Sequence, residues 1–538
     1  MIPCILHEDE HLLVVDKPAG LNTHAPAPFA GEGLYDWLRH REPRWATLSI
    51  IHRLDKETSG VMLFGKSPLA NRALTQQFTA HTVEKTYLLL TDRPVRRDAF
   101  MVKSTLVRVG EKYTGTRTGG EPAETHFRVR RRAGGCALLE ARPHTGRTHQ
   151  IRVHAAESGL PILGDTLYGG TPAARVHLHA AELAFQHPAT GAECRFASPV
   201  PFAAGGLPTA ANLEVPLARR NALLAPAETD AFRLLHGASD GWPGWYVERL
   251  GDFLYSQAVA PLSPEQLDTL RDLLTATGTR GAYHKRLDRQ VRRAAPDQVA
   301  PQLVLGNPAP DRFVVRENGL CFELSFQEGY SVGLFLDQRD NRRRFLTGHV
   351  AAGFPLQNAE RETGGAELLN TFAYTCGFSV AAAQAGWRTT SLDLSRKYLD
   401  WGRRNFALND LDPATHNFIF GDTFDWLRRL AKKGRRFDAV VLDPPTFSQS
   451  KAGGVFRAEK DYGALVRAAL AVLAPDGVLF ASTNTAGWPP EQFIAAVQGA
   501  VQAAGRTIRA EHFIPQPPDF PVSRAEPGYL KTLWLRVA

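Results

Sequence analysis

The first stretch of the sequence that could do chemistry surrounds a single acidic residue, Asp55. Apolar residues at 48–51 and 61–64 predict a strand on each side of it, and turn-forming residues occupy 58–60. A carboxylate held between two strands can attack a carbon atom and form a covalent intermediate. The positive charge of Arg53 lies two residues earlier. The alternative interpretation is a charged hairpin turn in which Asp55 is merely solvated.

Two later segments contain partners that such a carboxylate would need. Residues 85–90 predict a strand with Tyr87 facing one side, and residues 145–154 open a helix that contains Arg152. A guanidinium at salt-bridge distance keeps a carboxylate ionised and fixes its direction. The histidines at 144, 149 and 154 recur every five residues, which turns them away from a common helix face, so no metal site is expected.

The strings at 52–60 and 145–154, with the Lys-Pro-Ala-Gly turn at 17–20, resemble the signatures of RluA-type pseudouridine synthases over roughly residues 5–200. The resemblance implies an α+β domain with a mixed antiparallel sheet that needs no cofactor. It implies that Asp55 is the nucleophile that attacks uridine and that Arg152 pairs with it. It also implies that Tyr87 stacks on the target base and that Arg53 fills the gap left by the extruded base. For Tyr87 alone, the alternative is an aromatic residue in the core of a strand.

Composition and patterning divide the chain into four segments. We expect a synthase domain over 1–205, a Pro-, Gly- and Ala-rich linker over 206–225, a small α+β domain over 226–312 and an α/β domain over 313–538. The small domain resembles the central, PUA-like region of RlmI- and RlmK-type rRNA methyltransferases. Its Trp242 and Trp245 either stack on RNA bases or lie buried in a turn.

In the last segment, predicted strands alternate with predicted helices. Strands are expected at 367–370, before Asp393 and at 439–442, with a loop at 371–377 before the first helix. This alternation predicts a parallel, doubly wound sheet that binds its ligand at the carboxyl ends of the strands.

The order of these elements resembles a class I (Rossmann-like) S-adenosylmethionine-dependent methyltransferase. The resemblance implies that S-adenosylmethionine is the cofactor, with Asp393 on the ribose hydroxyls, Asp422 on the adenine amino group and Asn370 near the methionine part. The full set of cofactor residues that it implies is Asn370, Phe372, Tyr374, Gly377, Asp393, Asp422 and Asp443. Taken singly, each acid could instead end a strand or cap a helix.

The Asp-Pro-Pro-Thr-Phe motif at 443–447 indicates the base that is methylated. In related enzymes such motifs lie beside the methyl donor, so Asp443 is expected to act in catalysis and Pro444 and Phe447 to contact the base. Methylation of cytosine at C5 needs a cysteine thiolate that adds to C6. No cysteine occurs after Cys376, and residues 479–485 lack the one found in cytosine-modifying relatives. We therefore favour a guanine nitrogen, N7 as in the RlmK-like branch, over 5-methylcytosine.

Charge and cysteine content indicate the partner and the compartment. The chain has 63 Lys and Arg against 55 Asp and Glu, a net charge of +8. Its basic residues gather in clusters at 128–132, 285–293, 339–344 and 432–436, which favours contact with RNA phosphates. Five scattered cysteines fit a reducing cytoplasm, and neither a membrane span nor a secretory signal is expected.

These observations predict a bifunctional RNA-modifying enzyme. Its partner is expected to be 23S rRNA, with tRNA as an alternative substrate of the synthase. A competing hypothesis makes the methyltransferase-like domain a non-catalytic RNA-binding module for ribosome assembly. Methylation of a protein or a small molecule is disfavoured by the basic clusters and the fused synthase.

Overall fold

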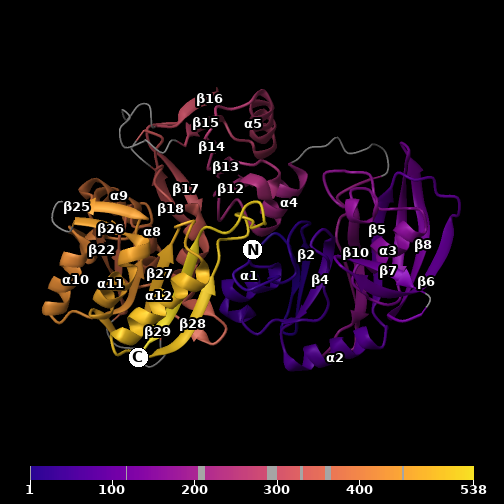
Figure 1. The fold of residues 1–538 in the computed structure, drawn as a ribbon, viewed down its shortest axis with the longest axis horizontal. Coiled ribbons are helices and arrows are strands. Elements are labelled where there is room, and N and C mark those ends of the chain that lie inside the picture. Colours follow the sequence, from indigo (N-terminus) through magenta and orange to yellow (C-terminus); the bar gives the residue numbers. More distant parts are fainter. Residues whose placement is uncertain are drawn as a thin grey trace. The chain divides into compact units, whose positions relative to one another are not determined.

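The computed structural model describes residues 2–116, 118–203, 213–287, 300–327, 331–357, 365–450 and 454–538 (Figure 1). The chain forms two compact units, one of residues 1–25, 33–36 and 47–225 and the other of residues 26–32, 37–46 and 226–538. Within the described ranges, no helix is long and apolar enough to cross a membrane.

One mixed sheet organises the first unit. Its strands are β1 (Ile5–Glu8), β2 (Leu12–Lys17), β3 (Ser49–Ile50), β4 (Ser59–Gly65), β5 (Glu84–Thr91), β6 (Ala99–Val109), β7 (Lys112–Thr116), β8 (Glu121–Ala133), β9 (Cys136–Pro143), β10 (Leu178–Gln186) and β11 (Glu193–Ala197). The main order is β1-β2-β4-β10-β5-β9-β8-β6-β7, with β3 on β4 and β11 on β10. Only the β4–β10 pair is parallel among these described strands, because β10 returns to the sheet after a long connection.

Helical segments between residues 34 and 223 belong mainly to the first unit, and residues 37–46 belong to the second. The segments are α1 (Leu34–Arg41), η1 (Pro43–Trp45), α2 (Pro68–Thr79), α3 (Gln150–Glu157), η2 (Thr166–Tyr168) and α4 (Glu214–Leu223). At the start of α2 the Ser67 hydroxyl accepts the backbone N–H of Ala70, and Pro68 occupies the first turn. Helix α4 lies in the predicted linker, where Arg219 donates to the Gly20 carbonyl at 3.0 Å; residues 204–212 of that linker lie outside the described ranges.

A five-stranded sheet forms the small α+β part of the second unit. It comprises β12 (Ala231–His236), β13 (Trp245–Leu250), β14 (Phe253–Ala258), β15 (Gly281–Arg286) and β16 (Gln302–Gly306), in that order, with η3 (Gly237–Asp240) after β12. Helix α5 (Pro264–Thr277) connects the parallel strands β14 and β15. Trp242 and Trp245 are both buried, with ring centroids 4.8 Å apart, so they pack in the turn and offer no stacking surface to a base.

The C-terminal part contains a seven-stranded sheet in the order β23-β22-β21-β24-β27-β29-β28. Its strands are β21 (Glu367–Thr371), β22 (Arg388–Asp393), β23 (Asn417–Phe420), β24 (Phe437–Leu442), β27 (Leu473–Thr483), β28 (Ile508–Ile514) and β29 (Lys531–Val537). The strands predicted at 367–370, before Asp393 and at 439–442 are parallel, whereas β29, for which no direction was predicted, runs antiparallel to both of its neighbours. The segment between β28 and β29 contains no helix, and a parallel return would need a crossover of that kind.

The remaining elements surround this sheet. They are β17 (Phe313–Glu317), β18 (Leu320–Leu324), η5 (Leu336–Gln338), α7 (Arg339–Thr347), β19 (His349–Ala351), β20 (Phe354–Pro355), α8 (Gly377–Gln384), α9 (Arg396–Ala407), η6 (Pro413–Thr415), α10 (Thr423–Lys432), β25 (Phe447–Ser450), β26 (Gly454–Arg457), α11 (Ala458–Leu470) and α12 (Pro490–Ala503). Successive residues of the central strands enter separate hydrophobic clusters: Leu368 and Val441 lie in one, Leu369 and Val440 in the other. Both faces are therefore covered, as the continuous apolar strands predict.

Candidate active sites

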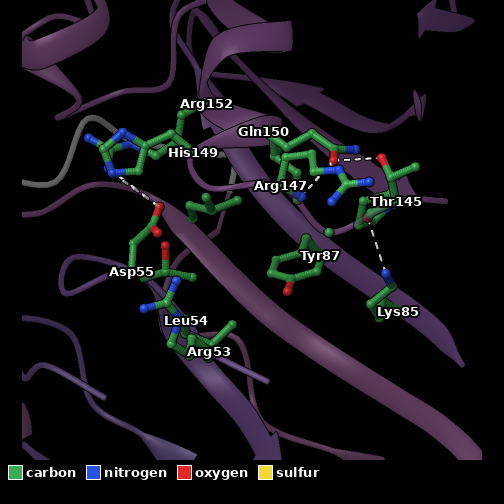
Figure 2. A pocket seen from close by; sticks show the side chains of 15 residues that line it. Arg53, Leu54, Asp55, Lys85, Tyr87, Thr145, Arg147, His149, Gln150 and Arg152 are labelled. Carbon is green, nitrogen blue, oxygen red and sulfur yellow. Dashed lines mark hydrogen bonds and ion pairs between the residues drawn. The ribbon is translucent and has the colours of Figure 1, made fainter. Parts of the chain in front are cut away.

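The loop between β3 and β4 holds Asp55 at a cavity of the first unit (Figure 2). Thr58 closes a turn by donating its backbone N–H to the Asp55 carbonyl at 3.1 Å. Beneath the loop, the fully buried ammonium of Lys17 donates to three backbone carbonyls, those of Pro18, Leu21 and Lys56, at 3.0, 2.7 and 3.3 Å. The backbone beside Asp55 is thus fixed, while its carboxylate remains 23% exposed.

Arg152, in the first turn of α3, lies among three carboxylates, of which Glu57 is the most distant at 3.8 Å from Nη1. Its Nη1 is 3.5 Å from Oδ2 of Asp55. Its Nε and Nη2 donate to the two oxygens of the buried Asp165 at 2.7 and 2.8 Å. Burial opposes the charge of the guanidinium, but the hydrogen bonds and the charge of Asp165 outweigh it and raise the pKa of Arg152.

The sequence analysis assigned no role to Asp165. It directly follows the apolar run 160–163 and Gly164, so burial of its side chain could have been expected. A buried carboxylate needs a cation or hydrogen-bond donors, and this requirement is the signal that could have identified the pair with Arg152.

The other residues implied by the resemblance line the same cavity. Tyr87 projects from β5, and burial together with Asp55 raises the pKa of its phenol, which therefore stays protonated. Arg53 is exposed at the cavity, and Arg147 also lines it. Lys85 donates to the Thr145 carbonyl at 3.1 Å, and burial lowers the pKa of its ammonium to about 8. The cavity therefore combines one carboxylate with several cations, which suits an RNA ligand.

The three histidines of the second motif have different partners. The His144 ring lies 5.3 Å from that of His81. His154 is buried and hydrogen-bonded to Thr125 and Ser104 at 2.9 and 3.0 Å. Only His149 of the three faces Asp55, with its Nε2 3.9 Å from Oδ2 of that carboxylate.

In the second unit, the loop after β21 leads into α8. Phe372, Tyr374 and Cys376 in this loop have positive φ angles of 54°, 48° and 65°. Gly377 begins the helix, and a Cβ there would lie 3.2 Å from the Arg342 side chain. Asn370 is buried and donates to the Ser379 hydroxyl at 2.9 Å, so its amide connects β21 to α8.

Asp393 ends β22 at the carboxyl edge of the sheet. One of its oxygens accepts the backbone N–H of Tyr374 and the other that of Ser395, both at 2.8 Å. Burial raises the pKa of this carboxyl group. Two large apolar side chains at the same edge remain exposed, Leu394 by 40% and Phe420 by 48%. A carboxylate beside exposed apolar side chains suits a ligand with hydroxyls and a flat ring.

Asp422 is the N-cap of α10 and accepts the backbone N–H of Asp425 at 3.1 Å. The helix-capping role considered for this acid is therefore present, and a contact with adenine would be an additional role.

Asp443 follows β24, and burial raises the pKa of its carboxyl group to about 6. Its side chain is hydrogen-bonded to Ser482 and Gln338, whose own side chains are 2.8 Å apart. Pro444 is buried, and Phe447 begins β25. Sequence reasoning missed Gln338 and Ser482, although the polar string 337–342 was visible as a signal.

Methylation of cytosine at C5 requires a cysteine thiolate, so the state of the five cysteines bears on which base is methylated. All five are free thiols. Cys376 is buried, and burial raises the pKa of its thiol to about 12, so it stays protonated. Ser482 and Thr483 end β27, and both are buried.

One predicted basic cluster does not form a surface for RNA. Arg339, Arg342 and Arg344 are buried. Arg339 pairs with Asp519, and Arg342 pairs with Glu317, each at 2.6 Å. The prediction of phosphate contact was wrong for these three, because Arg339 and Arg342 pair with buried acids and Arg344 donates to the Asp340 and Val350 carbonyls. The clusters at 128–132 and 432–436 are largely exposed, whereas 288–293 lie outside the described ranges.

Comparisons with known proteins match both halves of the chain. The family model of RNA pseudouridylate synthase matches residues 11–157, and that of S-adenosylmethionine-dependent methyltransferase matches residues 232–536. "Ribosomal RNA large subunit methyltransferase" of Deinococcus radiodurans is 36% identical over 348 residues, 62% of this chain and 81% of that protein. "Ribosomal large subunit pseudouridine synthase C" of Yersinia pestis is 38% identical over 210 residues, 37% of this chain and 65% of that protein.

Solved structures also include a similar protein. The structure of SMU.776 complexed with SAH is similar to this chain with a TM-score of 0.52 and 27% identity, covering 60% of this chain and 80% of that one.

Proposed function

The chain belongs to the S-adenosylmethionine-dependent methyltransferase family and also contains an RNA pseudouridylate synthase domain, and on this premise we propose that it modifies 23S rRNA at two kinds of site. The first unit isomerises uridine to pseudouridine, and the second methylates a guanine nitrogen. The observation that supports the first assignment most strongly is the arrangement of Asp55, Arg152 and Tyr87 around one cavity.

Each of these residues has a separate role in the isomerisation. The bond from C1′ to N1 breaks, the base rotates, and a bond from C1′ to C5 forms; C5 loses a proton and N1 gains one. Asp55 captures the sugar during the exchange, and Arg152 pairs with the carboxylate and directs it. Tyr87 supplies an aromatic face for the extruded base, and Arg53 occupies the gap that the base leaves.

The carboxyl edge of the second sheet fits S-adenosylmethionine. Asp393 is proposed to accept hydrogen bonds from the ribose hydroxyls, and the exposed Leu394 and Phe420 are proposed to flank the adenine. Asp422 is proposed to meet the adenine amino group, and Asn370, Phe372, Tyr374 and Gly377 to shape the methionine end. When bound, S-adenosylmethionine supplies the methyl group.

The methylated atom is proposed to be N7 of guanine. A thiolate mechanism at cytosine lacks support, since Cys376 is buried with a raised thiol pKa and 479–485 contain no cysteine. Methylation of N7 places positive charge on the purine without releasing a proton. The ionised carboxylate of Asp443 would stabilise that charge, while Pro444 and Phe447 contact the ring.

The small α+β part of the second unit is proposed to be a PUA-like RNA-binding domain. Together with the exposed basic clusters at 128–132 and 432–436, it would hold the RNA backbone. A cytoplasmic location belongs to the same proposal and agrees with the five free thiols.

Position-resolved mass spectrometry of 23S rRNA and tRNA tests these assignments. RNA from cells lacking the gene is compared with RNA from cells that express wild type, Asp55→Asn or Asp393→Ala. We expect Asp55→Asn to lose only pseudouridine and Asp393→Ala to lose only a methylated guanine. If Asp393→Ala changes neither methylation nor cofactor binding, the methyltransferase-like domain is a binding module instead.

A further inference from the structure

His149 lies in the synthase cavity, and the roles described above do not use it. Its Nε2 is 3.9 Å from Oδ2 of Asp55, and Nη1 of Arg152 is 3.5 Å from the same oxygen. Figure 2 shows both side chains on one side of the carboxylate. Within the described part of the chain, the other oxygen, Oδ1, accepts no hydrogen bond. The surroundings of Asp55 therefore distinguish its two oxygens.

The orientation of the imidazole is set by Tyr168. Nδ1 of His149 lies 2.8 Å from the Tyr168 hydroxyl. That hydroxyl oxygen already accepts the backbone N–H of Tyr113 at 2.9 Å, and burial raises the pKa of the phenol, so Tyr168 has a proton to donate to Nδ1. Burial also lowers the pKa of His149, which favours the neutral ring. A neutral imidazole that accepts at Nδ1 carries its proton on Nε2, the atom that faces Asp55.

The surrounding structure holds the ring in this place. The rings of Tyr113 and Tyr168 lie edge-on to it, with centroids at 5.5 and 5.6 Å. His149 has a φ of 57°, an uncommon conformation for a residue with a Cβ. The guanidinium of Arg152 lies over the Tyr168 ring at 5.1 Å. Tyr168 thus contacts both donors that face Oδ2.

We propose that His149 is a positioning residue of the isomerisation. Its Nε2–H, oriented by Tyr168, acts with Arg152 on Oδ2 of Asp55 and leaves Oδ1 to attack the ribose. In that attack the bond from Oδ1 to C1′ forms while the bond from C1′ to N1 breaks, and its electron pair leaves with the base. The 3.9 Å separation exceeds a hydrogen bond, and such contacts commonly tighten when substrate binds. The inference rests on the role of Asp55 in the proposed function.

The test is a single-turnover measurement with the full-length chain. The probe is 23S rRNA labelled as [5-³H]uridine, purified from cells that lack the gene, because loss of the C5 proton releases tritium. Four variants are compared with wild type: His149→Phe, His149→Gln, Tyr168→Phe and His144→Ala. RNA affinity is measured in parallel by filter binding. His144 is the matched control, since it is an exposed histidine of the same motif that does not line the cavity.

We expect His149→Phe to slow tritium release about 100-fold at unchanged RNA affinity. His149→Gln should recover at least about tenfold of this loss, because its side-chain amide can donate from nearly the place of Nε2. Tyr168→Phe should lie between these variants, and His144→Ala should match wild type.

Two results would overturn the inference: a rate for His149→Phe within about threefold of wild type, or equal rates for the Phe and Gln variants. If His149→Phe does not fold, a wild-type rate for Tyr168→Phe would overturn the inference instead. Asp55→Asn separates this inference from the proposed function. If that variant releases tritium at the wild-type rate, the assignment of Asp55 itself is wrong.

Discussion

Arg152 and Asp165 form a buried bidentate ion pair, with N–O distances of 2.7 and 2.8 Å, beneath the cavity that contains Asp55. Arg152 is thereby presented to Asp55 with one remaining nitrogen, Nη1, at 3.5 Å. The cation that serves the proposed nucleophile is therefore fixed by a second carboxylate, since a guanidinium can bind one carboxylate with two nitrogens and still offer a third.

Asp165→Asn should reduce pseudouridine formation about 100-fold, because the variant removes the charge that orients Arg152. It should also destabilise the first unit by about 3 kcal/mol, since the pair is buried and one charge remains without its partner. Tritium release and thermal unfolding measure these effects. Asp98→Asn is the control, as that acid is exposed. Unchanged tritium release in a folded Asp165→Asn protein would refute the orienting role.

The raised pKa of Asp443 predicts that the free energy of unfolding depends on pH. Burial raises the pKa of its carboxyl group to about 6 from 3.8 in the unfolded chain. Between these values the folded protein holds a proton that the unfolded chain has released, so the contribution of Asp443 to stability falls as pH rises from about 4 to 6. Asp443→Asn should remove this slope and raise the free energy of unfolding at pH 7 by up to about 3 kcal/mol. Denaturant unfolding at several pH values measures it, and parallel profiles for variant and wild type would contradict it.

The rate of methyl transfer should depend on pH in the opposite direction to stability. If the ionised carboxylate of Asp443 stabilises the methylated base, the rate rises with pH through about 6, and Asp443→Asn loses the activity despite its greater stability. The measurement is transfer of a tritiated methyl group to rRNA between pH 5 and 8. A flat wild-type profile over this range would exclude Asp443 as the group that titrates.

Asp393→Asn should weaken S-adenosylmethionine binding by about 10- to 100-fold, the effect of losing hydrogen bonds to a charged acceptor. Calorimetric titration of the full-length protein measures this affinity. Asp400→Asn is the matched control, because Asp400 is an exposed acid on the adjacent helix that pairs with Arg403. Equal affinities for the Asp393 and Asp400 variants would rule out the ribose contact.

Lys17→Met should destabilise the first unit by about 3 kcal/mol, because it removes the donor of the buried Pro18 and Leu21 carbonyls; the Lys56 carbonyl keeps the backbone N–H of Gly20. The loop beside Asp55 should loosen, and tritium release should slow. Hydrogen exchange at residues 54–58 measures the loosening. Exchange equal to wild type at this loop would show that Lys17 does not anchor it.

Three residues proposed from sequence motifs, Asp55, Tyr87 and Arg152, line one cavity in the structure. Each could be named because it lies in a distinct string on a strand end, strand or helix. Asp165, Tyr168 and the orientation of His149 could not, because they depend on where the turn after α3 brings its side chains. A pairing across a turn leaves no periodic signal in sequence.

In the second unit as well, sequence patterns predicted some features and could not predict others. The strand end that carries Asp443 followed from the apolar run 439–442, since buried parallel strands are apolar throughout. The strand before Asp393 contains Thr389, Thr390 and Ser391, so the alternation of strands and helices predicted it instead. The reversed direction of β29 depended on the helix-free connection before it. The buried arginines of 339–344 were expected to contact RNA phosphates because their acids, Glu317 and Asp519, lie outside that helix.

The most direct test of the two-activity account is the 23S rRNA modification map of cells that express Asp55→Asn in place of the wild-type chain. We predict that one or more pseudouridines disappear while the methylated guanine that depends on Asp393 remains at its wild-type level. A map in which every pseudouridine is retained would contradict the account.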